Sequence, residues 1–221
     1  MAIVAQHRNH WTLAAISGAI ILTVAGGIAW AATSRADDPS DTFTRAATAG
    51  AQAGDSPAAI VNGETITRAT LAEVQTQLQT FPAQGIDASN QTSVLDYLIR
   101  GALIRQEAAR RGLLPTDAEV TAAITETQRG YKQDLAAGKL PPVMVNILDG
   151  EAKVGHPLDS WTTDPVIRSA WRSMLTQAKL AADQASDIPA GTNNIAQLTQ
   201  QRLDQLVQRL RDAAQIQILI K

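Results

Sequence analysis

The chain has 221 residues, a net charge of −2 at pH 7 and no cysteine. This charge gives no reason to expect a nucleic-acid partner, and the lack of cysteine excludes a disulfide scaffold, a thiolate metal site and a thiol nucleophile. The three histidines are few for a histidine metal cluster. Aromatic residues make up 4% of the chain, so the core must be built from Leu, Ile, Val and Ala. Such a core favours packed helices over a β-sandwich.

Residues 11–32 are an uncharged, apolar stretch that follows a short polar segment, residues 1–10. The stretch is long enough to cross a hydrocarbon core about 30 Å thick as a helix, and Trp11 and Trp30 lie near its ends, where tryptophan anchors spans. Positive charge before the span and acidic residues after it favour a cytoplasmic N-terminus. We therefore predict a signal anchor that leaves the rest of the chain on the periplasmic or cell-wall side of a bacterial cell membrane. A signal peptide cleaved at Ala29–Ala31 is the alternative.

Residues 33–57 are predicted to form a disordered linker. Phe43 is the one large apolar residue in this segment, so the segment buries too little surface to offset its ordering entropy. Such a linker would hold a folded domain close to the membrane without fixing its orientation.

Residues 58–67 carry the pattern of a β-hairpin. Asn62 and Gly63 occupy the centre of a turn in which both residues need a positive φ. The two arms are short, so a third strand is expected beside them. Thr67 is then placed to cap a helix whose apolar residues recur with helical spacing. These residues are Leu71, Val74, Leu78 and Phe81.

Residues 93–112 form the predicted central helix. Apolar residues cover two of its sides, which is typical of a helix inside a core rather than on its surface. The remaining strip carries two acid–base pairs at i,i+4 spacing, which we expect to lie on the surface. The pairs are Asp96 with Arg100 and Glu107 with Arg111.

The ends of the predicted helices are marked by local sequence signals. Ser93 is expected to begin the central helix as part of a capping box, and Gly112 is expected to end it. Thr116 followed by Glu119 predicts a capping box for a third helix over residues 118–137.

Residues 138–192 form a less regular, helical insert in which Pro165 opens a helix. A last helix is predicted over residues 194–213. Residues 215–220 alternate isoleucine with other residues, a strand pattern that would be an aggregation hazard if left unpaired. We predict that this strand pairs with the hairpin. The result is a mainly α, multi-helix domain, residues 58–221, with a small β element and one transmembrane helix before it.

Three motifs occur in a fixed order along this domain. The motifs are Asn62-Gly63-x-x-Ile66-Thr67, a helix with Leu98, Ile99, Leu103, Ile104, Glu107, Ala108 and Gly112, and a strand after the last helix. Together they resemble the N-terminal domain of SurA-type periplasmic chaperones and foldases, over residues 58–124 and 195–221. Many relatives carry a parvulin-type prolyl isomerase domain of about a hundred residues before the last helix. Because residues 138–192 span about half that length and read as helical, the resemblance implies a membrane-anchored relative without this domain, and not an enzyme.

Apolar side chains in or beside the insert are the candidates for peptide binding, since Met and Trp can line an adaptable cleft. The candidates are Tyr131, Leu135, Met144, Leu148, Trp161, Trp171 and Met174. The alternative is that Trp171 and Met174 form the core face of their own helix.

Two polar sets have simpler interpretations than catalysis. His156, Asp159 and Asp164 are spaced as an acid–base or metal group, but a loop cap explains them without a ligand. Ser160 or Ser173 with Lys179 lacks the setting that a nucleophile pair requires.

The sequence therefore predicts a membrane-tethered extracytoplasmic chaperone-like protein, which binds unfolded or extended polypeptides between the third helix and the insert. No metal or cofactor is expected. The expected partners are polypeptide clients and the lipid bilayer, which residues 11–32 would span, with a homodimer or a membrane-complex partner as further options. Two alternatives stay open: a non-catalytic assembly or structural subunit that docks one dedicated partner at the membrane, and a vestigial peptidyl-prolyl isomerase.

Overall fold

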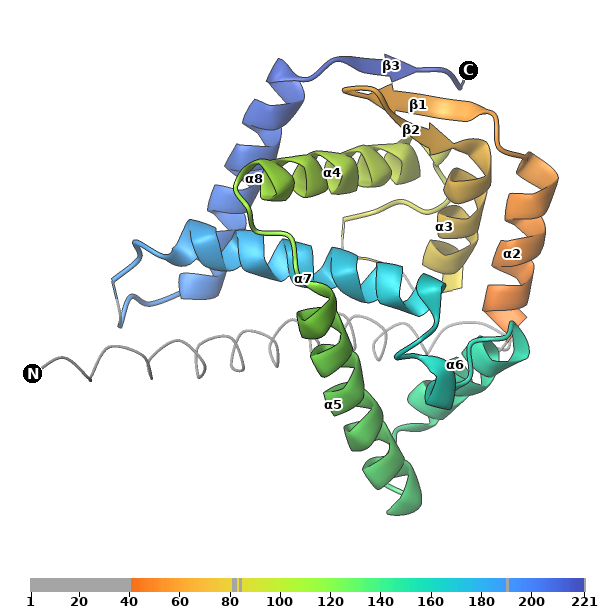
Figure 1. Ribbon diagram of the computed structural model, residues 1–221. Coiled ribbons are helices and arrows are strands. Elements are labelled where there is room, and N and C mark those ends of the chain that lie inside the picture. The colour runs from red at the N-terminus through yellow and green to blue at the C-terminus, as the bar shows by residue number, and fades with distance from the viewer. Residues whose placement is uncertain (1–40, 81–82, 84, 190, 221) are drawn as a thin grey trace, which may run out of the picture.

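Helices pack around one long central helix, and a small sheet closes one side of the fold (Figure 1). The computed structural model describes residues 41–80, 83, 85–189 and 191–220. Its elements are α2 (Thr42–Ala53), β1 (Pro57–Val61), β2 (Glu64–Thr67), α3 (Arg68–Thr80), α4 (Gln91–Arg110), α5 (Asp117–Ala136), α6 (Pro142–Lys153), the 3₁₀ turn η2 (Leu158–Ser160), α7 (Pro165–Ala185), α8 (Ile195–Ala213) and β3 (Ile216–Ile218). The prediction of a mainly α domain with a small β element is confirmed.

The predicted cytoplasmic segment, residues 1–10, and the predicted span, residues 11–32, lie outside the described residues. Among the helices that the structure does describe, none combines the length and the apolar character needed to cross a membrane.

The sheet joins the hairpin to the C-terminal strand. Strand β1 lies in the middle and pairs antiparallel with β2 on one side and β3 on the other. Asn62 and Gly63 have φ angles of 50° and 88° at the turn, as a type I′ hairpin requires. Ile60 lies opposite Thr65 in β2 and opposite Gln217 in β3. The predicted pairing of the C-terminal strand with the hairpin is therefore confirmed.

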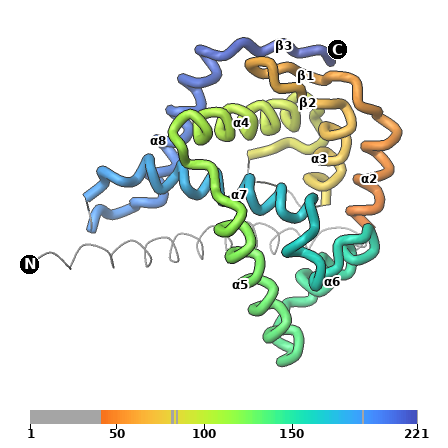
Figure 2. Tube along the Cα trace, in the orientation of Figure 1, coloured from red at the N-terminus to blue at the C-terminus, as the bar shows by residue number. Residues whose placement is uncertain are grey.

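The segment predicted to be a disordered linker contains helix α2, so the prediction of disorder is wrong for Thr42–Ala53. Helix α2 runs beside α3 (Figure 2). Its buried positions, Thr42, Ala46 and Gly50, recur every four residues and are all small. A side chain on Gly50 would clash with the Glu73 carboxylate, because the two helices approach closely there. Close packing of small residues therefore contributes to the order of a segment in which Phe43 is the one large apolar side chain.

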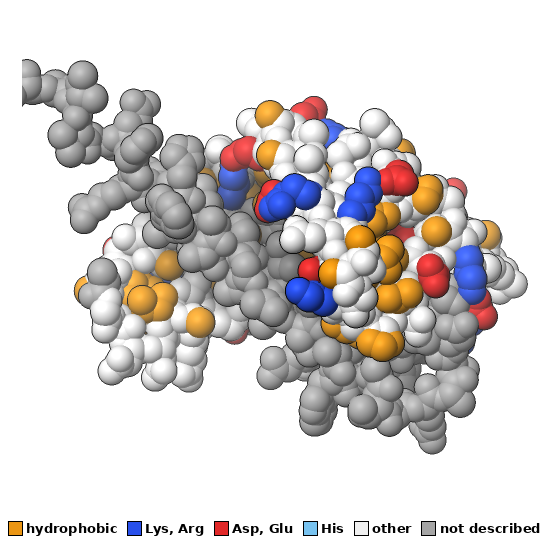
Figure 3. Space-filling model, turned by 90° about the horizontal axis from the view of Figure 1, so that it is seen from below, with side chains coloured by type: hydrophobic (Ala, Val, Ile, Leu, Met, Phe, Trp, Pro, Cys, Tyr) orange, Lys and Arg blue, Asp and Glu red, His pale blue; other side chains and the backbone are white. Residues whose placement is uncertain are grey.

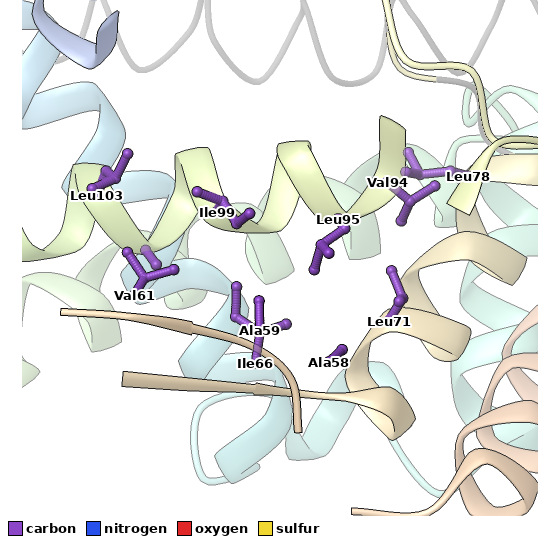
Figure 4. Close-up of a cluster of buried hydrophobic side chains, with 11 residues drawn as sticks. Ala58, Ala59, Val61, Ile66, Leu71, Leu78, Val94, Leu95, Ile99 and Leu103 are labelled. Carbon is purple, nitrogen blue, oxygen red and sulfur yellow. The ribbon is translucent and has the colours of Figure 1, made fainter. Parts of the chain in front are cut away.

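One side of α4 faces the sheet and α3 across a cluster of buried residues, called here the sheet core (Figure 4). Leu95, Ile99 and Leu103 of α4 are buried in this cluster with Val61 and Ile66 of the hairpin, and Leu95 points from α4 towards the strands. Full burial of each such side chain stabilises the fold by about 1.5–3 kcal/mol. Hydrogen bonds also join the hairpin to α4. Gln106 Nε2 donates to the Val61 carbonyl at 3.1 Å, and Asn62 Nδ2 donates to Gln106 Oε1 at 2.8 Å.

The opposite side of α4 packs against α7 and α8. Ile104 lies there in a second cluster, called the α8 core, whose other buried members are Leu180, Leu203, Leu206 and Val207. The prediction that α4 is apolar on two sides because it lies inside the domain is confirmed.

Local capping chemistry sets most helix ends as predicted. Thr116 and Glu119 form the reciprocal capping box of α5. Helix α4 ends in a Schellman motif. In this motif the Gly112 amide donates to the Ala109 carbonyl, and the amide of the following residue donates to the Ala108 carbonyl. The predicted start of α4 is wrong, because Asn90 is the capping residue and its side chain accepts from the Thr92 amide.

Candidate functional site

Most of the residues predicted to bind peptide lie in a third cluster, called the insert core, where α5 meets α6, η2 and α7. Leu148, Trp161 and Trp171 are buried there, and Tyr131 and Met174 pack against them. The structure therefore brings five of the seven candidates together. It places three of these five in the interior, where a bound peptide has no access to them.

A hydrogen bond and a ring contact fix Trp161 in the insert core. Its indole Nε1 donates to the His156 carbonyl at 3.0 Å, and the Tyr131 ring meets it edge-on, with 6.0 Å between ring centroids and 81° between planes. Burial raises the pKa of Tyr131. A buried tryptophan whose N–H has a partner is a structural residue, so the interpretation of this set as core fits the geometry.

The other two candidates lie elsewhere. Leu135 is 49% exposed near the C-terminal end of α5, and Met144 is half-buried in the first part of α6. Ion pairs fix α5 against α7 near its other end, where Asp117 pairs with Arg168 and Arg172. Helix α5 is thus anchored at one end and presents an apolar side chain to solvent at the other.

A cavity of about 550 Å³ lies between α4, α8 and the loop that precedes α4; it is called here the α4–α8 groove. Tyr97 is its largest side chain and is 42% exposed. Ile86 and Val207 supply apolar surface. The remaining lining residues are polar or glycine: Gly85, Asn90, Thr92, Ser93, Asp96, Arg100, Asp204, Gln208 and Arg211.

Two ion pairs connect the helices across the groove. Arg100 of α4 donates to Asp204 of α8 at 2.6 Å, and Arg211 of α8 donates to Asp96 of α4 at 2.7 Å. The predicted pairing of Asp96 with Arg100 is therefore wrong, since each takes a partner from α8. All four side chains are partly exposed, so each pair contributes only about 0–1 kcal/mol. Their main effect is to leave the groove with balanced charge.

The position of α4 relative to α7 depends on Glu107. The prediction that this residue lies on the surface is wrong, because its side chain is only 4% exposed. Its carboxylate accepts from Arg110 and from Arg111, with 2.7 Å to the Nε of each, so the predicted Glu107–Arg111 pair is confirmed. The hydrogen bonds from Arg110 are the largest cause of a lowered pKa of Glu107, about 2, against the opposing effect of burial. Arg111 also binds Asp183 of α7, which links the two helices.

The polar sets in the insert have structural roles. Asp164 caps α7 by accepting from the Val166 and Ile167 amides, and its other oxygen lies 2.6 Å from His156 Nδ1. Asp159 instead pairs with Lys132. No group of three or more acidic or histidine side chains among the described residues is placed to hold a metal ion. The predicted cap by Asp164 is confirmed.

The two serines considered as nucleophiles are engaged in local bonds. Ser160 Oγ donates to the Pro157 carbonyl and Ser173 Oγ to the Ser169 carbonyl. Lys179 forms an ion pair with Glu119. Neither serine is therefore paired with this lysine.

Sequence reasoning missed the α4–α8 groove. The sequence patterns give no binding role to Tyr97, Asp204 or Arg211. The available signal was an aromatic residue between Asp96 and Arg100 on one helix, with a second Asp and Arg, Asp204 and Arg211, on the last helix. The face in Figure 3 shows hydrophobic side chains among charged ones of both signs, so such patterns alone do not single out a site.

A mainly helical domain, in which an N-terminal hairpin and a C-terminal strand share one sheet, is the class that this fold defines. A family model described as "SurA-like N-terminal domain" matches residues 1–135. The chain belongs to this family. The match ends within α5, so α6, α7, α8 and β3 lie beyond it. No curated protein and no solved structure matches the chain.

Proposed function

We propose that the protein is a membrane-tethered, extracytoplasmic chaperone-like protein that binds unfolded or extended polypeptides in the α4–α8 groove. The observation that carries this proposal is the groove itself, with exposed Tyr97 and apolar Val207 in its lining, in a member of the SurA-like N-terminal family. Its volume of about 550 Å³ lies within the range of about 300–1,000 Å³ that is common for ligand sites.

The lining suits a polypeptide better than a charged small molecule. Tyr97 offers an apolar ring with a polar tip, which binds varied side chains at low entropic cost. Asn90, Ser93 and Gln208 carry amide and hydroxyl groups that can exchange hydrogen bonds with a peptide main chain. Because the two arginines are already paired with aspartates, a strongly anionic ligand would have to break both pairs.

The tether is proposed from the sequence. Residues 11–32 would span the membrane, with the domain on the periplasmic or cell-wall side. A groove held there would meet polypeptides as they emerge from the membrane, before they fold.

A direct binding measurement tests the proposal. The full-length protein in detergent is titrated into a fluorescein-labelled, permanently unfolded polypeptide, and anisotropy is followed. We expect saturable binding in the micromolar range, weakened about tenfold by Tyr97→Ala, equivalent to about 1.4 kcal/mol, and retained by Tyr97→Phe.

Leu135→Ala is the matched control, because Leu135 is exposed to a similar extent but lies on α5. If Leu135→Ala weakens binding and Tyr97→Ala does not, the site lies at α5, as the sequence predicted. No binding at several hundred micromolar would contradict the proposed function.

The second candidate is an assembly subunit, and exposed Leu135 near the end of α5 favours it. Leu135 would be one contact for a dedicated partner, because it is exposed on a helix whose other end is fixed to α7 by ion pairs. Purification from solubilised membranes separates the two functions. One stoichiometric protein that is lost with Leu135→Ala supports assembly, whereas many substoichiometric proteins support chaperone activity.

A further inference from the structure

Strand β3 is the outer strand of the sheet (Figure 1). It pairs with β1 on one side, with Ile216 opposite Val61 and Ile218 opposite Ala59. The order β2-β1-β3 leaves its other side without a neighbouring strand among the described residues.

The hydrogen bonds to β1 fix the direction of each backbone group in β3. The Asn62 amide donates to the Gln215 carbonyl at 2.9 Å, and the Leu219 amide donates to the Ala58 carbonyl at 2.8 Å. In an antiparallel ladder the amide and carbonyl of one residue point to the same side, and successive residues alternate. The groups of Gln215, Gln217 and Leu219 therefore face β1, and those of Ile216 and Ile218 face outward.

Apart from its shortness, this edge lacks the features with which proteins usually block strand pairing. Natural edge strands are very short, carry charges, prolines or bulges, or are covered by another element. Residues 213–220 contain no charge and no proline, and the β1–β3 register is regular. Ile218 is 51% exposed, and among the described residues no strand lies on the side to which its backbone groups point.

We propose that the outer edge of β3 binds an extended segment of a client polypeptide as a fourth strand of the sheet. This inference rests on the proposed function and adds a mode of recognition to it. Main-chain pairing uses groups that every polypeptide carries, so it gives affinity without demanding a sequence. A protein that binds varied unfolded chains needs that property.

A second copy of this chain is a weaker occupant for the edge. Specific protein interfaces involve about 20–30 residues on each side, whereas β3 offers three residues, Ile216–Ile218. An extended client fits this short edge because its affinity would be shared with contacts made elsewhere on the protein.

The test substitution removes the backbone N–H of Ile218, which faces away from β1, and leaves the neighbouring N–H groups in place. Ile218→Pro deletes the amide that faces away from β1 and leaves the amides of Gln217 and Leu219 in place, at an edge position that tolerates proline. The full-length protein is titrated with a labelled, uncharged peptide of eight residues with high strand propensity. We expect Ile218→Pro to weaken binding at least fivefold. Leu219→Thr, which changes a 43% exposed side chain directly after the strand but no outward backbone group, should bind like the wild type.

A second measurement does not depend on whether the proline variant folds. The same peptide, N-methylated at alternate residues along its pairing edge, is titrated into the wild-type protein, and we expect at least a fivefold loss. If both the unmodified and the N-methylated peptides bind equally well, the edge proposal is overturned while the proposed function stands. If no peptide or unfolded polypeptide binds at all, both fail. A concentration-dependent dimer that Ile218→Pro abolishes would overturn the edge proposal by identifying a second copy as the occupant.

Discussion

Replacement of Glu107 by glutamine tests how α4 is held against the rest of the domain. Glu107 is 4% exposed, and its pKa of about 2 compares with an ordinary value of 4.5. Each pKa unit corresponds to about 1.4 kcal/mol, so ionic pairing of this buried carboxylate stabilises the fold by up to about 3 kcal/mol. Solvent screening at the exposed guanidinium of Arg110 reduces this value. We therefore expect Glu107→Gln to lower the free energy of unfolding by about 2–3 kcal/mol at pH 7.

The loss should depend on pH in a defined direction. The pKa of Glu107 is lower in the folded state than in the unfolded state. The stabilisation by Glu107 is therefore complete above about pH 4.5 and is lost as the pH falls towards 2. The difference between wild type and Glu107→Gln should shrink to about half at pH 3. Urea unfolding of the full-length protein, followed by circular dichroism at both pH values, measures the difference.

Glu126→Gln is the matched control for this prediction. Glu126 pairs with Arg129 at the same i,i+3 spacing, but its side chain is 69% exposed, so we expect no measurable change in stability. Equal effects of the two substitutions would refute the assignment of Glu107 as a buried anchor. So would a Glu107→Gln effect of the same size at pH 7 and pH 3.

Three further predictions follow from the insert core, its loop and the sheet. Trp161→Ala should lower the free energy of unfolding by about 3–5 kcal/mol, because the side chain is buried and its N–H is hydrogen-bonded. Urea unfolding measures this loss, and a loss below about 1 kcal/mol would mean that Trp161 is not a core residue. Burial raises the pKa of Glu151 to about 7, so its neutral form is favoured on folding and stability should fall as the pH rises from 4.5 through 7. Urea midpoints between pH 5 and 8 should decline less steeply for Glu151→Gln, and identical slopes would contradict this. Deletion of Gln215–Lys221 removes β3 from β1 and should abolish cooperative thermal unfolding, so retention of the wild-type melting temperature would contradict the closed architecture.

The features that could be predicted from sequence are those set by local chemistry. The Asn62–Gly63 turn and the Thr116–Glu119 capping box each depend on residues within a few positions of one another. The pairing of β3 with the hairpin is not local, but it could still be predicted, because only one other segment of the chain had strand character.

The ion-pair partners of charged side chains on distant helices could not be predicted. An i,i+4 acid–base pair is geometrically available to Asp96 and Arg100, but α8 places Arg211 and Asp204 within reach. Helix α2 was missed for a related reason. Its stability comes from small residues that let it approach α3, and hydrophobicity alone does not register that kind of packing.

The burial of several predicted site residues has a general physical reason. Large apolar side chains such as those in the insert are the ones that gain most from burial. Trp161 and Trp171 accordingly form a core. The side chain that remains available at the groove, Tyr97, has a polar end and only partial burial.

Both surfaces proposed to bind polypeptide depend on the C-terminal part of the chain. The groove needs Asp204, Val207 and Arg211 of α8, and the open edge belongs to β3, which follows α8 directly. The family match, by contrast, ends at residue 135, so it covers the central helix and the hairpin but neither α8 nor β3. The proposed binding surfaces therefore combine α4, which lies within the family match, with α8 and β3, which lie beyond it.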